Sequence, residues 1–343
     1  MLGFVLSTFL LAWPTLVVGG AGENGYGCDC DYDCDYDYDY DYDYDADADA
    51  DADPVASADS GIGGGGKEPE RAGADNPALV AVLEKAEIRG EIKKLTGGNM
   101  IKYVFRLEDG SRDGLKVVLK PEQAGDWGDW RYEVAAWHLD QALGYGLVPA
   151  TAIRELPMSL FDLSDPKIAE LLRPGQKEAP RPDERLCGAV QVWVAESRVA
   201  DEGEGRAWAD AMLTELGSPG TAIKDPAVAS FFVRMVIFDF LLSDPDRYSG
   251  GNLLKDSTGR FWAIDNAGAF VGCVRPRTDL NKLKRFEKEA VQRLRKLNRK
   301  ELRTKLAGLV SERQLRQLWK RRGEALDRVH ELGDKLGKKR VLF

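Results

Sequence analysis

The sequence contains few of the residues on which several enzyme classes depend. Its 343 residues include five cysteines and two histidines, His138 and His330, which lie far apart. The cysteines are too few and too scattered for a disulfide scaffold, and none has the spacing of a zinc site. A Ser-His-Asp hydrolase or a histidine-rich metal centre would have only these two imidazoles to use. These absences favour chemistry carried by carboxylates.

Charge is distributed unevenly along the chain. The net charge is −9, yet residues 1–53 contain no Lys or Arg and carry −14, while residues 274–343 carry +14. Because electrostatic fields act through local patches, the basic segment could attract an acidic substrate, an anionic lipid or a nucleic acid. Aromatic residues do not interleave with the basic ones, so no nucleic-acid partner is expected.

An uncharged apolar run, Leu2 to Val18, is followed by small residues through Gly22. This pattern predicts a secretory signal peptide over residues 1–22. A membrane anchor is the alternative, although seventeen residues that include Pro14 are short for a spanning helix. We therefore expect an exported or membrane-anchored protein, in a secretory lumen, a periplasm or outside the cell, with a cytoplasmic location as the alternative.

Residues 23–83 have the composition of a disordered tail and linker. From Asp29 to Asp53, Asp alternates with Tyr or Cys and then with Ala, and glycine and charged residues follow. Dense like charge repels itself and offers no face to bury. A solvated spacer is the plain interpretation and loose calcium binding the alternative. The folded domain is predicted to span residues 84–343.

Hydrophobic patterning predicts a strand-rich first part and a helical second part. A three-strand meander with a glycine turn at residues 97–99 precedes a helix, a further strand and a buried helix, and two short strands and a basic amphipathic helix follow. The predicted ranges are Ala86–Leu95, Met100–Leu107, Leu115–Pro121, Trp130–Leu143, Cys187–Val194, Val228–Leu242, Leu253–Leu254, Phe261–Ile264 and Arg277 to the end.

Five polar residues supply the kinds of group that phosphoryl transfer requires. Such a site needs a cation for the nucleotide phosphates, an acid to hold that cation, oxygen ligands for a metal and a carboxylate near the acceptor hydroxyl. The candidates are Lys120, Glu133, Asp246, Asn252 and Asp265.

Each candidate alone has a plainer interpretation. Lys120 could be a solvated strand residue and Glu133 a surface acid, while Asp246 and Asn252 could form turns. Turn chemistry does not explain why Asp265 follows a strand so soon after that loop. Asp244 competes with Asp246 as the base. Asp239, inside the apolar helix, is expected to be a buried hydrogen-bonding residue.

Five segments within residues 86–330 are similar to those of one known superfamily: Val118-Leu119-Lys120-Pro121, Arg131 to Trp137, Gly146 to Thr151, Asp246-Arg247 with Asn252, and Ile264-Asp265-Asn266. Together they resemble the atypical kinase superfamily that includes phosphatidylinositol 3- and 4-kinases, HipA-type kinases, and four-jointed and Golgi casein kinase-type secretory kinases.

The resemblance implies an α+β, bilobal fold, with a small N-terminal sheet lobe and a larger helical lobe that hold ATP between them. It implies that Lys120 binds phosphate and that Glu133 is its ion-pair partner. It makes Asp246 catalytic and makes Asn252 and Asp265 the ligands of Mg²⁺ or Mn²⁺. The hinge beside adenine would be Gln191 to Val194, including Trp193.

The predicted function is ATP- and metal-dependent phosphoryl transfer to a hydroxyl of a protein, lipid or small molecule, and the fold does not decide which. Relatives have His where this chain has Tyr248. They have four residues between the Asp and the Asn of the loop, whereas this chain has five between Asp246 and Asn252. A nucleotide-binding pseudokinase without turnover is therefore the first alternative. A tethered partner-binding module that uses the acidic tail is the second.

Overall fold

The computed structural model describes residues 77–96, 100–125, 128–176, 178–195, 198–199, 202–248, 251–270 and 279–343. All of them belong to the compact unit that runs from Ser60 to Phe343. The predicted signal peptide, the Asp-rich tail and the glycine turn lie outside the described residues.

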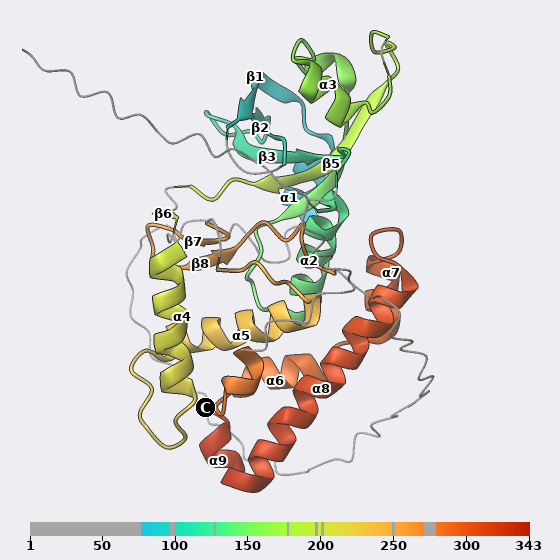
Figure 1. The fold of residues 1–343 in the computed structure, drawn as a ribbon. Helices are drawn as coiled ribbons and strands as arrows, with labels where there is room; N and C mark the ends of the chain where they lie inside the picture. Colours follow the sequence, from blue (N-terminus) through green and yellow to red (C-terminus); the bar gives the residue numbers. More distant parts are fainter. Residues whose placement is uncertain are drawn as a thin grey trace, which may run out of the picture. The chain divides into compact units, whose positions relative to one another are not determined.

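Antiparallel strands form the first part of the fold (Figure 1), in the sheet order β1-β2-β3-β5-β4. The predicted meander of three strands is confirmed, and β5 begins and ends two residues before the predicted strand. Strand β4, which pairs with β5, was not expected. The bounds are β1 Ile88–Leu95, β2 Lys102–Leu107, β3 Leu115–Pro121, β4 Thr151–Pro157 and β5 Arg185–Val192.

Helix α2 (Trp130–Leu143) has the predicted bounds. Asp129 caps its start by accepting a hydrogen bond from the backbone of Arg131, and Gly144 ends it with a left-handed φ of 61° that a residue without a Cβ adopts easily. The helix contacts β4 and β5 of the sheet and also α6 and α7. It therefore joins the sheet to the helical part.

Helix α1 (Pro77–Lys85) lies mostly within residues 23–83, which the sequence predicts to be a disordered tail and linker. Proline suits the first turn of a helix, and Leu83 is fully buried. The Leu83 carbonyl accepts a hydrogen bond of 2.8 Å from Arg154 on β4. Order thus begins earlier than expected, because this short helix is stabilised by a strand seventy residues away.

The second part of the fold is helical, so the predicted α+β class is confirmed. Helix α5 has Asp225 as its N-cap, Pro226 in its first turn and a left-handed Ser243 at its end, and it is buried nearly all round. The remaining elements are η1 Met158–Leu160, α3 Pro166–Leu172, β6 Arg198–Val199, α4 Glu202–Leu216, α5 Pro226–Leu242, β7 Leu253–Lys255 and β8 Phe261–Ala263.

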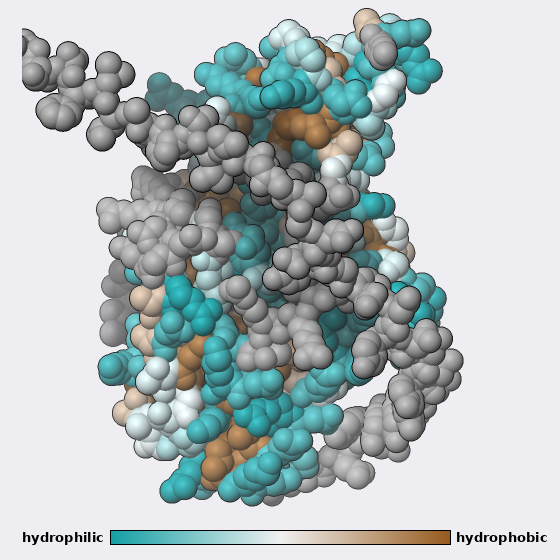
Figure 2. Space-filling view, viewed as in Figure 1, coloured by the Kyte–Doolittle hydropathy of each residue, from teal (hydrophilic) through white to brown (hydrophobic). Residues whose placement is uncertain are grey.

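The basic C-terminal segment is helical, as expected, and it is divided into several helices. Side-chain caps at Asn298 and Ser311 start new helices and so divide the segment. The elements are η2 Asp279–Lys282, α6 Lys288–Arg295, α7 Arg299–Lys305, α8 Glu312–Leu336 and α9 Lys338–Val341. On the face shown in Figure 2, hydrophilic residues cover most of the described surface. Across the described segments, no helix combines the length and the apolar character needed to cross a membrane.

Candidate active site

One face of the sheet brings two lysines together. Tyr103 of β2 pairs with Leu119 of β3, so Lys102 and Lys120 are neighbours on the opposite face. On β5, Gln191 pairs with Val118 and Ala189 with Lys120. We call this side the lysine face, and it carries Lys102, Val104, Val118, Lys120, Ala189 and Gln191.

Lys120 and Glu133, the two residues that the family resemblance pairs, form a buried ion pair. The Lys120 ammonium donates to Glu133 Oε1 and, at 3.1 Å, to Asp265 Oδ1. The side chains of Lys120 and Glu133 are 4% and 0% exposed. Burial alone would lower the pKa of Lys120, but the carboxylates of Asp265 and Glu133 raise it above its ordinary value. Lys120 is therefore held fully charged.

Lys102 is a site residue that sequence reasoning missed. Its ammonium donates to Asp265 Oδ2 at 3.0 Å, so each oxygen of Asp265 faces a different lysine. The charge of Lys120 holds the pKa of Asp265 far below its usual range. Burial acts in the opposite direction, and Lys102 lowers the pKa further. Asp265 also adopts a left-handed φ of 58°, which is uncommon outside glycine and recurs at functional sites.

Strands β7 and β8 place Asn252 and Asp265 at the same end of one hairpin. The backbone N–H of Ile264, next to Asp265, donates to the Asn252 carbonyl at 2.9 Å. The Asn252 amide nitrogen donates to the Asp246 carbonyl at 2.9 Å, which leaves its Oδ1 available as a ligand. Among the described residues, no group of three or more His, Cys, Asp and Glu side chains could hold a metal alone.

One carboxylate and one carboxamide oxygen nevertheless fit Mg²⁺ or Mn²⁺, because such ions take one or two protein oxygens and complete their shell with phosphates and water. The residues present thus suit a metal that arrives with a phosphorylated ligand.

Arg247 ties the loop before this hairpin to the rest of the fold. Its guanidinium donates to Asp239 and Asp244, both at 2.9 Å, and to the carbonyls of Asn252 and Ile264. Burial raises the pKa of Asp239 to about 7, although Arg247 opposes that shift. Asp239 is therefore a hydrogen-bonding residue inside the helix, as the sequence indicated, although its side chain is only partly buried, at 13% exposed.

The two candidate bases lie in different surroundings. Asp244 is 4% exposed, is paired with Arg247, and accepts a hydrogen bond of 2.9 Å from the backbone N–H of Asp246. The side chain of Asp246 is exposed. Tyr248 packs against the core, with the Arg206 guanidinium 5.4 Å from its ring centroid.

The predicted hinge, Gln191 to Val194, includes the end of β5 and the two residues after it. Gln191 is buried and donates to the Thr151 hydroxyl at 2.9 Å. Trp193 continues the sheet by donating from its backbone to Lys116, whose ammonium lies 3.7 Å from its ring centroid. Val194 is partly buried. Gln191 lies on the lysine face, two positions along β5 from Ala189, which pairs with Lys120, and Trp193 and Val194 continue beyond it.

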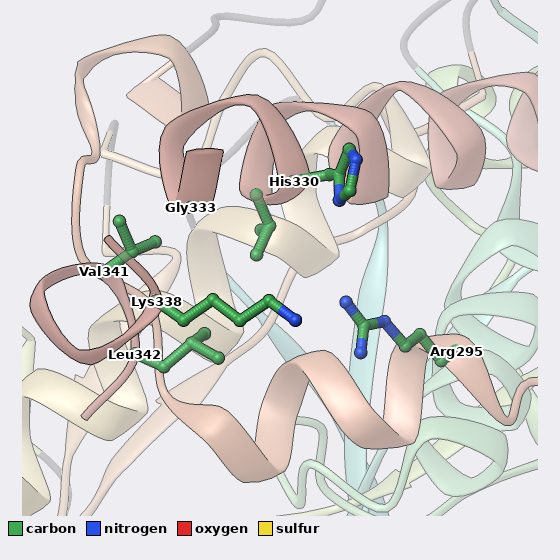
Figure 3. Close-up of a pocket in the computed structure, with 7 residues that line it drawn as sticks. Arg295, His330, Gly333, Lys338, Val341 and Leu342 are labelled. Carbon is green, nitrogen blue, oxygen red and sulfur yellow. The ribbon is translucent and has the colours of Figure 1, made fainter. Parts of the chain in front are cut away.

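A separate small pocket of about 70 Å³ lies among α6, α8 and α9 (Figure 3). Arg295 and Lys338 point toward one another there, near His330. None of its described lining residues is a predicted site residue, so the ion pairs around Lys120 define the candidate site.

No family model and no curated protein matches the sequence. Solved structures do match the fold. A hydra Fam20 structure with sugar is 16% identical, with a TM-score of 0.56 over 79% of this chain and 93% of its own. Golgi casein kinase with Mn/ADP bound is 17% identical, with a TM-score of 0.53 over 77% of each chain. Another Golgi casein kinase structure has a TM-score of 0.51, also at 17% identity and 77% of each chain. The chain therefore shares the fold of the Fam20 and Golgi casein kinase structures.

Proposed function

We propose that the domain is a kinase that transfers the γ-phosphoryl group of ATP to a hydroxyl group. The observation that carries the proposal is the buried group in which Lys120 joins Glu133 of α2 to Asp265 after β8. Burying the charges of Lys120 and Glu133 is costly unless they are paired, and Asp265, which is 28% exposed, places a second carboxylate on the same lysine. The likeness to kinase structures supports this interpretation.

In this proposal Lys120 and Lys102 bind the nucleotide phosphates. Both ammoniums now contact Asp265, the carboxylate that holds their positions on the lysine face. Phosphate oxygens are anions of the same kind and would accept the same hydrogen bonds. Val104 and Val118, next along the lysine face, would pack against the base, and Gln191 to Val194 would border it.

Asn252 and Asp265 would hold Mg²⁺ or Mn²⁺. The metal would neutralise charge on the phosphates, as it does in phosphoryl transfer generally. A Golgi casein kinase structure carries Mn/ADP, which supports this choice of cofactor.

Asp246 is the proposed catalytic base. It would accept the proton of the acceptor hydroxyl as the new oxygen–phosphorus bond forms and ADP leaves. Its side chain is exposed, so an acceptor can reach it, whereas Asp244 is buried against Arg247. Asp244 instead holds the loop that presents Asp246.

A binding experiment tests the nucleotide site. ATP should raise the melting temperature of the protein in Mg²⁺ or Mn²⁺, and EDTA should remove the shift. Asp265→Asn should abolish it, because the variant keeps the size of the side chain and loses its charge. Equal stabilisation of the variant and the parent would contradict the metal assignment.

A turnover experiment tests the base. Asp246→Asn should keep ATP affinity and lower phosphoryl transfer by about 100-fold or more. Casein and simple sugars are suitable first acceptors, given the structures that the chain is similar to. An enzyme that stays active after this change but not after Asp244→Asn would move the base two residues upstream.

A nucleotide-binding pseudokinase is the second candidate. Tyr248, at the position where relatives have His, packs against the core, with the Arg206 guanidinium near its ring. Metal-dependent ATP binding with neither transfer nor ATP hydrolysis by the parent protein would select this alternative.

A further inference from the structure

The amide group of Gln191 has its orientation determined by a chain of hydrogen bonds. The Thr151 hydroxyl lies 2.8 Å from the carbonyl of Pro149, which can only accept. A hydroxyl has one hydrogen, so that hydrogen must point at Pro149. The Thr151 oxygen can then only accept from Gln191, 2.9 Å away. The amide nitrogen of Gln191 therefore faces Thr151, and its carbonyl oxygen Oε1 faces elsewhere.

The Oε1 atom has no hydrogen-bond partner among the described residues. Fully buried side-chain atoms without a partner are confined to Tyr103, Gln123, Trp137 and Arg328 in that part of the chain. Oε1 is not among them, so it reaches solvent even though Gln191 as a whole is 3% exposed. A single acceptor atom is thus presented from an otherwise buried side chain.

The position of this acceptor is set by the sheet. Gln191 pairs with Val118 and therefore lies on the lysine face, one pleat repeat, about 7 Å, from Lys120 along the sheet. If Lys120 binds phosphate, the base of the nucleotide lies further along this face, next to Val118 and the segment that follows β5.

We propose that Gln191 selects the purine base, with Oε1 accepting a hydrogen bond from a 6-amino group and disfavouring a 6-oxo group. An amino group donates to the carbonyl, whereas an oxo group would place two acceptors against each other. Thr151 is the positioning residue, because it prevents the amide from turning over. This inference rests on the proposed nucleotide site and assigns the selection of its base to one side chain.

The probes are ATP and inosine triphosphate, which differ at the 6-position, with Mn²⁺ and the full chain. Dissociation constants should favour ATP by about 10-fold or more, as expected when a buried acceptor would otherwise lose its partner. Gln191→Met, of similar volume, should bring the two constants within about threefold of each other. Melting temperatures without nucleotide establish that each variant is folded.

Two variants of Thr151 separate orientation from packing. Thr151→Val removes the acceptor, frees the amide to turn and should improve the relative affinity for inosine triphosphate. Thr151→Ser keeps the hydroxyl and should keep the preference for ATP. Absence of binding by either nucleotide would overturn the proposed function and this inference together. Binding of ATP with no preference, or a preference unchanged in both Gln191→Met and Thr151→Val, would overturn the inference alone.

Discussion

At the scale of single residues, burial separates the two lysines that contact Asp265. Lys120 and Glu133 are almost completely inaccessible, whereas the side chains of Lys102 and Asp265 are 20% and 28% exposed. Water therefore screens the contact of Lys102 with Asp265 but not the contact of Lys120 with Glu133. The same type of side chain, bound to the same carboxylate, should contribute very differently to stability.

We expect Lys120→Ala to lower the free energy of unfolding by about 3 kcal/mol or more, because Glu133 would be left buried and uncompensated. Lys102→Ala should cost about 1 kcal/mol or less. Urea titrations of both variants measure this. The double change Lys120→Met with Glu133→Gln removes both charges and should recover much of the loss. Equal losses for the two single variants would contradict the contrast.

His138 gives a second prediction at this scale. Burial, aided by Lys305, lowers its pKa to about 4 from an ordinary value of 6.5. The unfolded chain therefore takes up this proton at a higher pH than the folded protein does. Stability present above pH 6.5 is lost as the pH falls toward 4, by up to about 2 kcal/mol after allowance for partial exposure.

The measurement compares unfolding free energies at pH 7 and pH 4.5 for the parent and His138→Gln. The variant should lose less stability than the parent over this range. His330→Gln, which removes the other imidazole of the chain, is the matched control. The prediction fails if the parent and His138→Gln show the same pH dependence.

At the scale of elements, the first turn of α8 holds the helix that carries Glu133. Gln314 forms a capping box with Ser311, its Oε1 accepting from the Ser311 backbone at 2.8 Å. Its amide nitrogen donates to the Tyr132 hydroxyl at 2.7 Å and to the Phe270 carbonyl at 2.9 Å. One side chain thus connects α8, α2 and the segment that follows Asp265.

The oxygen of the Gln314 amide accepts the capping-box hydrogen bond, whereas its nitrogen donates to Tyr132 and Phe270. Substitutions can therefore remove the two contributions separately. Gln314→Glu keeps the acceptor for the capping box and loses the donor, whereas Gln314→Ala loses both. We expect both variants to lower the free energy of unfolding. Tyr132→Phe, which removes only the hydrogen bond between Gln314 and the Tyr132 hydroxyl, is the reference. Gln314→Ala should lower the free energy of unfolding by about 1 kcal/mol more than Tyr132→Phe.

If the proposed function holds, Gln314→Glu should also lower turnover, because Glu133 would be held less firmly. Amide hydrogen exchange in α2 provides a readout independent of activity and should rise in Gln314→Glu. Unchanged exchange in α2 would mean that Gln314 serves only the start of its own helix.

At the scale of the whole molecule, the N-terminal segment gives a prediction about location. The apolar run before Gly20 and the acidic stretch that follows predict export, so a full chain with a C-terminal tag should enter the secretory or export route and lose roughly its first 22 residues. N-terminal sequencing of the tagged product measures this. A cytosolic product that retains Met1 to Gly20 would contradict the signal-peptide prediction, and a membrane-bound product that retains it would favour an anchor.

The sequence by itself determined those features that depend on local chemistry. Apolar segments bounded by turn residues predicted β2 and β3, a capping Asp and a terminal Gly set the bounds of α2, and the apolar run before Leu242 predicted a buried helix. Motif resemblance indicated the lysine, its glutamate and the hairpin acid. These signals are short in range, because caps, pleats and helical periods are set by neighbours along the chain.

Only the tertiary structure decided the contacts between distant segments. Lys102 faces Asp265 because β2 pairs with β3 and the β7–β8 hairpin lies against them, 163 positions away in the chain. Helix α1 is ordered by Arg154 of β4, and Gln191 is oriented by Thr151, 40 positions before it. Such pairs have no local signature, since a lysine or glutamine on a strand looks the same whether solvent or another segment covers it. Burial and hydrogen-bond direction, which give these side chains their chemistry, exist only once the chain has folded.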